Sequence, residues 1–166
     1  MMVEYVTRAV VLEKKIWREC DGVIYFFTED WGLIKARARG IKKITSKLSG
    51  HLEPGDLVLV RLVEGKGTWV VDALKEREIK IGLPSLQVVR FLASLWQRDD
   101  DVFGKLLKGG VLEKDFLSHF GFNHRFSKCQ VCGHSKPDFF ELENHDFVCR
   151  ICSPSLKIEP DKVICI

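Results

Sequence analysis

Four of the six cysteines in this 166-residue chain form two pairs, each with two residues between its cysteines. Cys129 and Cys132 make the first pair, Cys149 and Cys152 make the second, and 16 residues lie between them. Two thiolates at this spacing can bind one metal ion from a single tight turn, and two such turns complete a tetrahedron. We therefore predict that these four cysteines hold a structural zinc ion.

The residues alone leave alternatives to this zinc site. Gly133 follows the first pair, as in an iron-binding knuckle, so a rubredoxin-like iron site is the nearest rival. His134 and His145 lie between the pairs, where an imidazole could replace a thiolate. The remaining cysteines, Cys20 and Cys165, have no partner pattern, and the sequence assigns them no role.

Motifs for catalysis are missing from the sequence. A site closed by four sulfurs leaves no position for a catalytic water. The sequence contains no glycine-rich phosphate loop and no Gly-x-Ser-x-Gly elbow. We therefore expect a binding protein and not an enzyme.

The positive charge of the chain is concentrated in residues 31–50. The formal net charge is +3, yet residues 1–30 carry four Lys or Arg against six acids, and residues 51–166 carry sixteen against seventeen. Residues 31–50 hold six basic side chains and no acid. This segregation favours contact with a nucleic-acid backbone. The six predicted DNA-binding residues are Lys35, Arg37, Arg39, Lys42, Lys43 and Lys47.

The spacing of the first three of these side chains suits a strand. Alternate residues of a strand share a face, so Lys35, Arg37 and Arg39 point one way and the apolar residues between them point the other. An ordinary solvated strand face is the plain alternative. Tyr25, Phe27, Trp31 and Trp69 could offer stacking faces to bases, but the alternation of residues 23–27 predicts that most of these rings belong to the core.

The first 80 residues, which contain this segment, predict a small closed barrel or sandwich. Five runs rich in β-branched and aromatic residues are separated by turn residues such as Asp30-Trp31-Gly32. The five predicted strands are Val6–Lys14, Val23–Thr28, Leu33–Arg39, Leu57–Val63 and Thr68–Leu74.

Helical periodicity begins near Pro84. Ser85 is a plausible N-cap for a helix over Leu86–Gln97, and the acidic run Asp99–Asp101 can cap a second helix over Val102–Lys108. A third short helix is predicted over Leu112–Phe120. We thus expect two domains, 1–80 and 81–166, with the cysteine module at about 126–153 in the second.

The opening residues are not a secretory signal, because charged residues interrupt the apolar ones. No apolar run approaches the roughly 20 residues that span a membrane. We expect a cytoplasmic protein without a membrane partner, in a compartment where paired cysteines bind metal in preference to forming disulfides.

Residues 7–12, 27–43, 46–48 and 52–56 resemble the N-terminal domain of the RecO family of bacterial recombination mediators. The most specific stretch is Thr28–Lys43. The order of β region, helical region and cysteine pairs also matches this family. The resemblance implies an α+β protein with a five-stranded OB-fold barrel, followed by a small helical region with a zinc-ribbon-like four-cysteine module.

The resemblance also implies a function. Proteins of this family bind single- and double-stranded DNA, anneal complementary strands, and act with RecR to load recombinase in recombinational DNA repair. The six basic residues fall on the DNA-binding side of the OB-fold. Only fourteen residues follow Cys152, so contact with single-strand-binding protein stays open. The rival interpretation is a zinc-ribbon interaction module of transcription or translation, and a redox protein is the second rival.

Overall fold

The computed structural model describes residues 3–17, 20–41, 48 and 50–166. The chain forms two compact units, Met1–Val111 and Leu112–Ile166. The first two helices therefore belong to the same unit as the β region, and the predicted domain division at residue 80 stays a prediction. Among the helices of the described part of the chain, none has the length and hydrophobicity needed to cross a bilayer.

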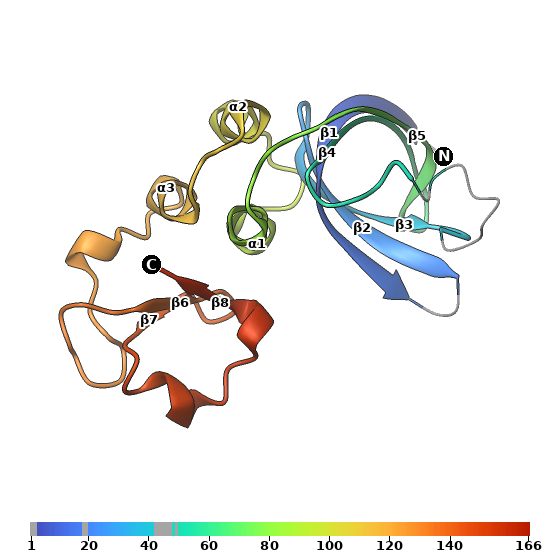
Figure 1. Cartoon of the computed structure of the whole chain (residues 1–166). Coiled ribbons are helices and arrows are strands. Elements are labelled where there is room, and N and C mark those ends of the chain that lie inside the picture. The colour runs from blue at the N-terminus through green and yellow to red at the C-terminus, as the bar shows by residue number, and fades with distance from the viewer. Residues whose placement is uncertain (1–2, 18–19, 42–47, 49) are drawn as a thin grey trace. The chain divides into compact units, whose positions relative to one another are not determined.

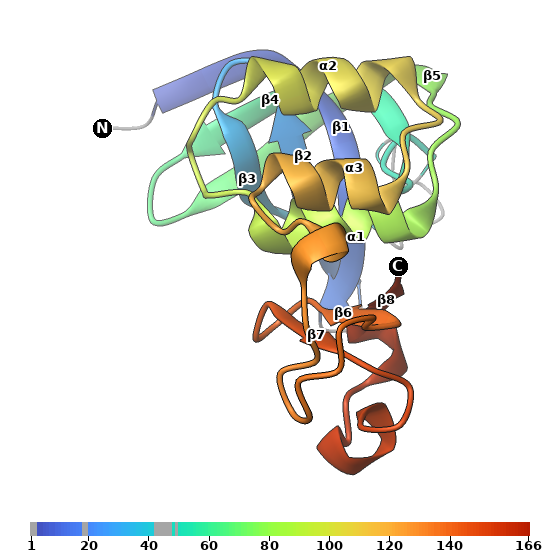
Figure 2. The same cartoon turned by 90° about the vertical axis from the view of Figure 1, so that its left-hand side faces the viewer.

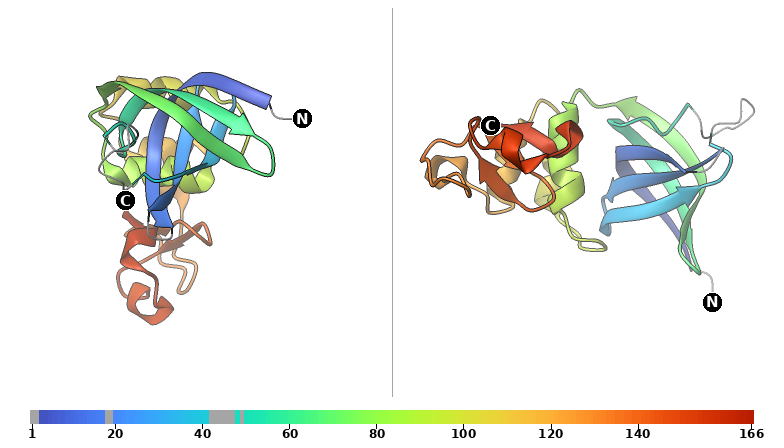
Figure 3. Two further views of the ribbon diagram at one scale, coloured as in Figure 1. Left: turned by 90° about the vertical axis from the view of Figure 1, so that its right-hand side faces the viewer. Right: turned by 90° about the horizontal axis from the view of Figure 1, so that it is seen from below.

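The first unit is built on the five expected strands, which close into a barrel (Figures 1 and 3). The order around the barrel is β1-β2-β3-β5-β4, and β4 pairs with β1. The paired strands are antiparallel except for β3 and β5. The strands are β1 (Val3–Trp17), β2 (Asp21–Thr28), β3 (Gly32–Ala38), β4 (Asp56–Glu64) and β5 (Thr68–Glu78).

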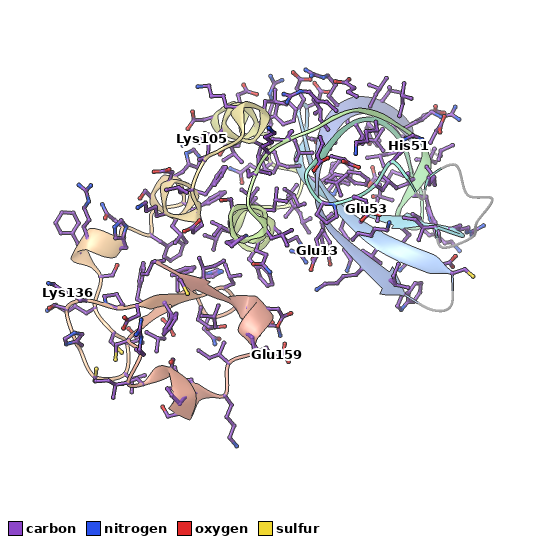
Figure 4. All side chains as sticks on the ribbon, in the orientation of Figure 1. Glu13, His51, Glu53, Lys105, Lys136 and Glu159 are labelled. Atoms are coloured by element: carbon purple, nitrogen blue, oxygen red, sulfur yellow. The ribbon has the colours of Figure 1, made fainter. Side chains whose placement is uncertain are left out.

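The barrel interior is filled by alternate apolar residues of all five strands, as the period of two requires. β1 is also buried on its other face, because Val10 and Leu12 are as inaccessible as Ala9 and Val11. Helix α1 (Leu83–Leu92) packs against this strand, and Arg90 of α1 forms an ion pair with Glu13 of β1. Glu13 is labelled in Figure 4.

The helix predicted over Leu86–Gln97 is wrong at both ends. α1 starts at Leu83, and Ser85 does not cap it because its hydroxyl donates to the carbonyl of Val111. α1 ends at Leu92 because the next residues join the barrel: Leu95 forms a β-bridge with Leu33, and the Trp96 N–H donates to the Leu33 carbonyl. Helix α2 (Asp100–Lys108) is capped by Asp99, as predicted.

Gly32 makes this return of the chain sterically feasible. Its φ is +66°, and a Cβ built on it would lie 1.8 Å from the carbonyl oxygen of Gln97. We expect Gly32→Ala to lower the free energy of unfolding by about 2 kcal/mol or more, from combined backbone strain and overlap. Denaturant titration measures this loss.

Gly110→Ala is the matched control for the Gly32 variant. Gly110 has nearly the same φ, +64°, but a Cβ there would meet no atom within 4 Å. Its cost is therefore backbone strain alone, about 1 kcal/mol. Equal losses in the two variants would contradict the contact that we assign to Gly32.

The second unit contains helix α3 (Glu113–His119) and a small sheet that the sequence did not predict. β6 (Phe139–Glu141) pairs with both β7 (Asp146–Val148) and β8 (Val163–Cys165), giving the order β7-β6-β8 (Figure 2). These strands have three residues each, which is too short for a period to be visible in the sequence. Three 3-10 turns complete the unit: η1 (His124–Phe126), η2 (Ser153–Leu156) and η3 (Pro160–Lys162).

Candidate metal centre and nucleic-acid interface

Two tight turns of the second unit present the four paired cysteines. In the first turn the Gly133 N–H donates to the Cys129 carbonyl, and the Cys129 N–H donates to the His134 carbonyl. In the second turn the N–H groups of Cys152 and Ser153 both donate to the Cys149 carbonyl. Strand β7 leads directly into Cys149, so the small sheet fixes where the second turn begins. Each turn aims a pair of sulfurs at one point.

The four sulfur atoms of Cys129, Cys132, Cys149 and Cys152 lie within 4.8 Å of one another. The Sγ atoms of Cys132 and Cys149 are 3.7 Å apart, far beyond a disulfide bond of about 2.05 Å. A tetrahedral zinc site with bonds of about 2.3 Å separates its sulfurs by about 3.8 Å. The cluster therefore fits a tetrahedral metal ion.

The acidities of these thiols point to the same need for a cation. Burial raises the pKa of Cys129, but N–H groups of Cys149, Cys132 and Val131 outweigh burial and lower this pKa to about 6. The neighbouring sulfurs of Cys132 and Cys149 raise the pKa of Cys152 to about 12. Four sulfurs this close cannot all carry negative charge unless a cation compensates it.

The two histidines between the cysteine pairs are not part of the cluster. Within the described residues, the candidate metal group consists of the four cysteines alone. His134 and His145 are exposed, and the His145 ring lies beside Phe122 at 5.5 Å. Cys20 and Cys165 also lie outside the cluster.

Strand β3 carries the first half of the predicted basic surface. Lys35, Arg37 and Arg39 are exposed, and the alternate residues of the strand are buried in the barrel. None of the three forms an ion pair with another described residue. By contrast, Arg8 and Arg61 on the same barrel pair with Glu76 and Glu4. The charge of β3 is thus available to a ligand.

Aromatic rings alternate with the arginines on this surface. The guanidinium carbon of Arg37 lies 5.4 Å from the ring centroid of Trp17 and 5.5 Å from that of Trp69. Arg39 lies 4.5 Å from the Trp69 ring. Trp17 is 42% exposed. We call Trp17, Lys35, Arg37, Arg39 and Trp69 the β3 surface.

The sequence interpretation placed only one of these tryptophans near the site. Tyr25 and Phe27 are buried, and Trp31 packs on the barrel core with its ring 4.8 Å from that of Tyr5. Trp17 went unnoticed because it lies at the end of a longer β1 than predicted. The signal that could have found it is the hairpin in which Trp17, at the end of β1, pairs with Asp21 at the start of β2. Strands β2 and β3 then lie between β1 and β5, the strand that carries Trp69.

Tyr25 links the β3 surface to α1. Its ring lies 5.7 Å from the Lys35 ammonium on one strand and 3.3 Å from the Arg90 guanidinium carbon on the helix. Stacking of this kind fixes the orientation of long cationic side chains. The other three predicted residues, Lys42, Lys43 and Lys47, lie outside the described residues.

Comparison with known proteins finds similarity to the RecO family. The family model "Recombination protein O N terminal" matches residues 1–80. A DNA repair protein RecO of Dehalococcoides mccartyi is 40% identical over 63 residues, which is 38% of this chain and 25% of the relative. RecO of Geobacter metallireducens is 27% identical over 79% of this chain and 64% of the relative.

RecO of Syntrophomonas wolfei extends the similarity further, with 26% identity over 89% of this chain and 69% of the relative. The matched part thus ranges from a quarter to about two thirds of the length of these relatives. The family model lies within the barrel unit, and the two longer matches cover 79% and 89% of this chain at lower identity. Residues 1–80 thus match the N-terminal domain of the RecO family, and a weaker similarity to RecO proteins extends over most of the chain.

Proposed function

We propose that this protein binds DNA through the β3 surface and acts in recombinational DNA repair as a strand-annealing mediator. The observation that carries the proposal is that Arg37 and Arg39, which have no ion-pair partner among the described residues, lie beside tryptophan rings from two other strands of the closed barrel, Trp17 of β1 and Trp69 of β5. Cations bind phosphates regardless of sequence, and ring faces stack on unpaired bases. Two strands on such a surface would have their phosphate repulsion screened while their bases stay free to pair.

The strand order supports an OB-fold as the scaffold. A five-stranded barrel in the order β1-β2-β3-β5-β4 is compatible with this fold, whose members bind nucleic acids on one side of the barrel. We further propose that the cysteine cluster holds zinc as a structural ion in a ribbon-like module. The role of the ion would be to hold together the two cysteine turns, around which the buried cluster is small.

Annealing requires positioning and charge screening and no bond-breaking group, so the proposal is of a binding protein. Action with RecR, loading of recombinase and contact with single-strand-binding protein are extensions that the similarity to the RecO family suggests. The DNA-binding step is the one that the β3 surface supports directly.

The direct test is fluorescence anisotropy of a labelled single-stranded oligonucleotide titrated with the protein over a salt series. If the three cations of the β3 surface each contact a phosphate, the logarithm of the association constant should fall linearly with the logarithm of salt concentration, with a slope of about −2 or steeper. Binding in this manner should be accompanied by accelerated annealing of complementary strands. A slope near zero, or absence of binding at low salt, would overturn the proposal.

A further inference from the structure

Charge within the second unit is divided between its two halves. Residues 112–137 contain four Lys or Arg and two acids, whereas residues 138–166 contain three Lys or Arg and six acids. In the acidic half, Lys162 contacts both Glu143 and Glu159, and Arg150 contacts Asp138. The charges of that half are therefore largely internal to it.

The cations of the basic half have no such partners. Lys114, Arg125, Lys128 and Lys136 are exposed, and none of them forms an ion pair with another residue in the described part of the chain. Lys136 projects from the loop after the first cysteine pair (Figure 4). Unpaired cations on one side of a small unit attract a polyanion.

A polar depression of about 270 Å³ lies where α3 meets η1. Lys114, Asn123, His124 and Arg125 line it together with Ser118 and a single acid, Asp115. The Asn123 carboxamide oxygen accepts from the Arg125 N–H, which leaves the amide N–H₂ for a ligand. Nδ1 of His124 is buried and has no hydrogen-bond partner among the described residues. Two cations and an amide form a donor set suited to a phosphate, and the His124 side chain lines the same depression.

Phe126 lies next to this depression in the sequence and is 83% exposed. The exposure is unusual in a unit whose Phe116 and Phe140 are fully buried. The ring follows Arg125 directly, and Lys128 comes two residues later. A flat apolar ring among cations suits stacking on an unpaired base better than contact with an acidic peptide, which has no π-face to offer.

We propose that Lys114, Arg125, Phe126 and Lys128 form a second nucleic-acid contact, in which a phosphate enters the depression and an unpaired base stacks on Phe126. The proposal rests on the proposed function for its class of ligand, but its residues belong to a different unit from the β3 surface. A single strand would then be held at two separate places on one chain.

The test uses the full chain and an oligothymidylate of about 30 nucleotides, longer than the roughly 16 that one barrel can cover. Arg125→Glu/Lys128→Glu should make the slope of log association constant against log salt concentration less negative by about 1.4. Phe126→Ala should weaken binding about tenfold at fixed salt. Lys157→Glu, a charge reversal on an exposed residue of the acidic half, is the control and should bind like the unmodified protein.

The same titrations with Arg37→Glu/Arg39→Glu separate this inference from the proposed function. Full affinity in the Arg125/Lys128 and Phe126 variants, with loss only in the β3 variant, would overturn the inference and leave the proposed function intact. Loss of affinity only in the Arg125/Lys128 and Phe126 variants would support the inference and overturn binding through the β3 surface. Displacement of the DNA from the β3 variant by a glutamate dodecamer as effectively as by oligothymidylate would identify an acidic-peptide surface and overturn the inference.

Metal content of each variant shows whether the second unit is still folded. If charge reversal lowers the metal content, photocrosslinking of the unmodified protein to a bromodeoxyuridine oligonucleotide tests whether DNA contacts the second unit. A crosslink at Phe126 supports the contact. Crosslinks confined to the barrel unit contradict it.

Discussion

Cys149→Ser should lose the metal ion and unfold the second unit while the barrel stays intact. Serine is a hard oxygen ligand that stays protonated at neutral pH, so three sulfurs remain and metal affinity should fall at least about 100-fold. The metal binding energy of structural four-cysteine sites, about 10–16 kcal/mol in apparent terms, is also folding energy. Around the sulfurs, the buried cluster of the described residues comprises Cys129, Val148 and Cys149, with Cys152 and Ile158 packed on it, so few apolar contacts would hold the two turns together without the ion.

Elemental analysis of the purified variant gives the metal content, and hydrogen exchange gives the folding of each unit. We expect zinc at one ion per chain in the unmodified protein and almost none in Cys149→Ser. Amides of β6, β7 and β8 should lose protection in the variant, and amides of β1–β5 should keep it. Iron and a coloured preparation would favour the rubredoxin-like alternative.

Cys165→Ser is the matched control for the Cys149 variant. Cys165 belongs to the same unit and is exposed on β8, outside the sulfur cluster. It should keep its metal and its protected amides. Full metal occupancy in Cys149→Ser would rule out a site that depends on four thiolates.

The sequence predicted the features that depend on local pattern. The alternation of Ile34, Lys35, Ala36 and Arg37 indicates a strand with one buried face, and that strand is β3. The cysteine spacing predicts two turns around one ion, because each turn is local and four sulfurs suffice to close the site.

Features that depend on tertiary contact could not be predicted in this way. The apolar stripe of α1 continues past Leu92 in the sequence. Leu95 and Trp96 nevertheless lie outside the helix, because their backbone groups pair with Leu33 of β3 instead of forming helical hydrogen bonds. Trp96 accepts a φ of 59° to do so. The neighbourhood of Trp17, Arg37 and Trp69 is likewise set by barrel closure, which joins strands that are distant in the sequence.

Arg37→Glu/Arg39→Glu should weaken binding of single-stranded DNA about 100-fold or more. The double reversal changes the local charge by four units and removes two cations that no acid neutralises within the described residues. It also removes the guanidinium groups that lie beside Trp17 and Trp69. If each arginine contacts one phosphate, the slope of log association constant against log salt concentration should become less negative by about 1.4. Anisotropy titrations at several salt concentrations measure both quantities.

Stability should change little in this variant, because both side chains are exposed and the barrel interior is untouched. Lys80→Glu/Lys108→Glu makes the same change of net charge at two exposed lysines of the same unit, away from β3. If general attraction to the polyanion governed binding, the two double variants would weaken it alike. If the β3 surface holds the strand, the control should lose at most about threefold in affinity, and its salt dependence should match that of the unmodified protein.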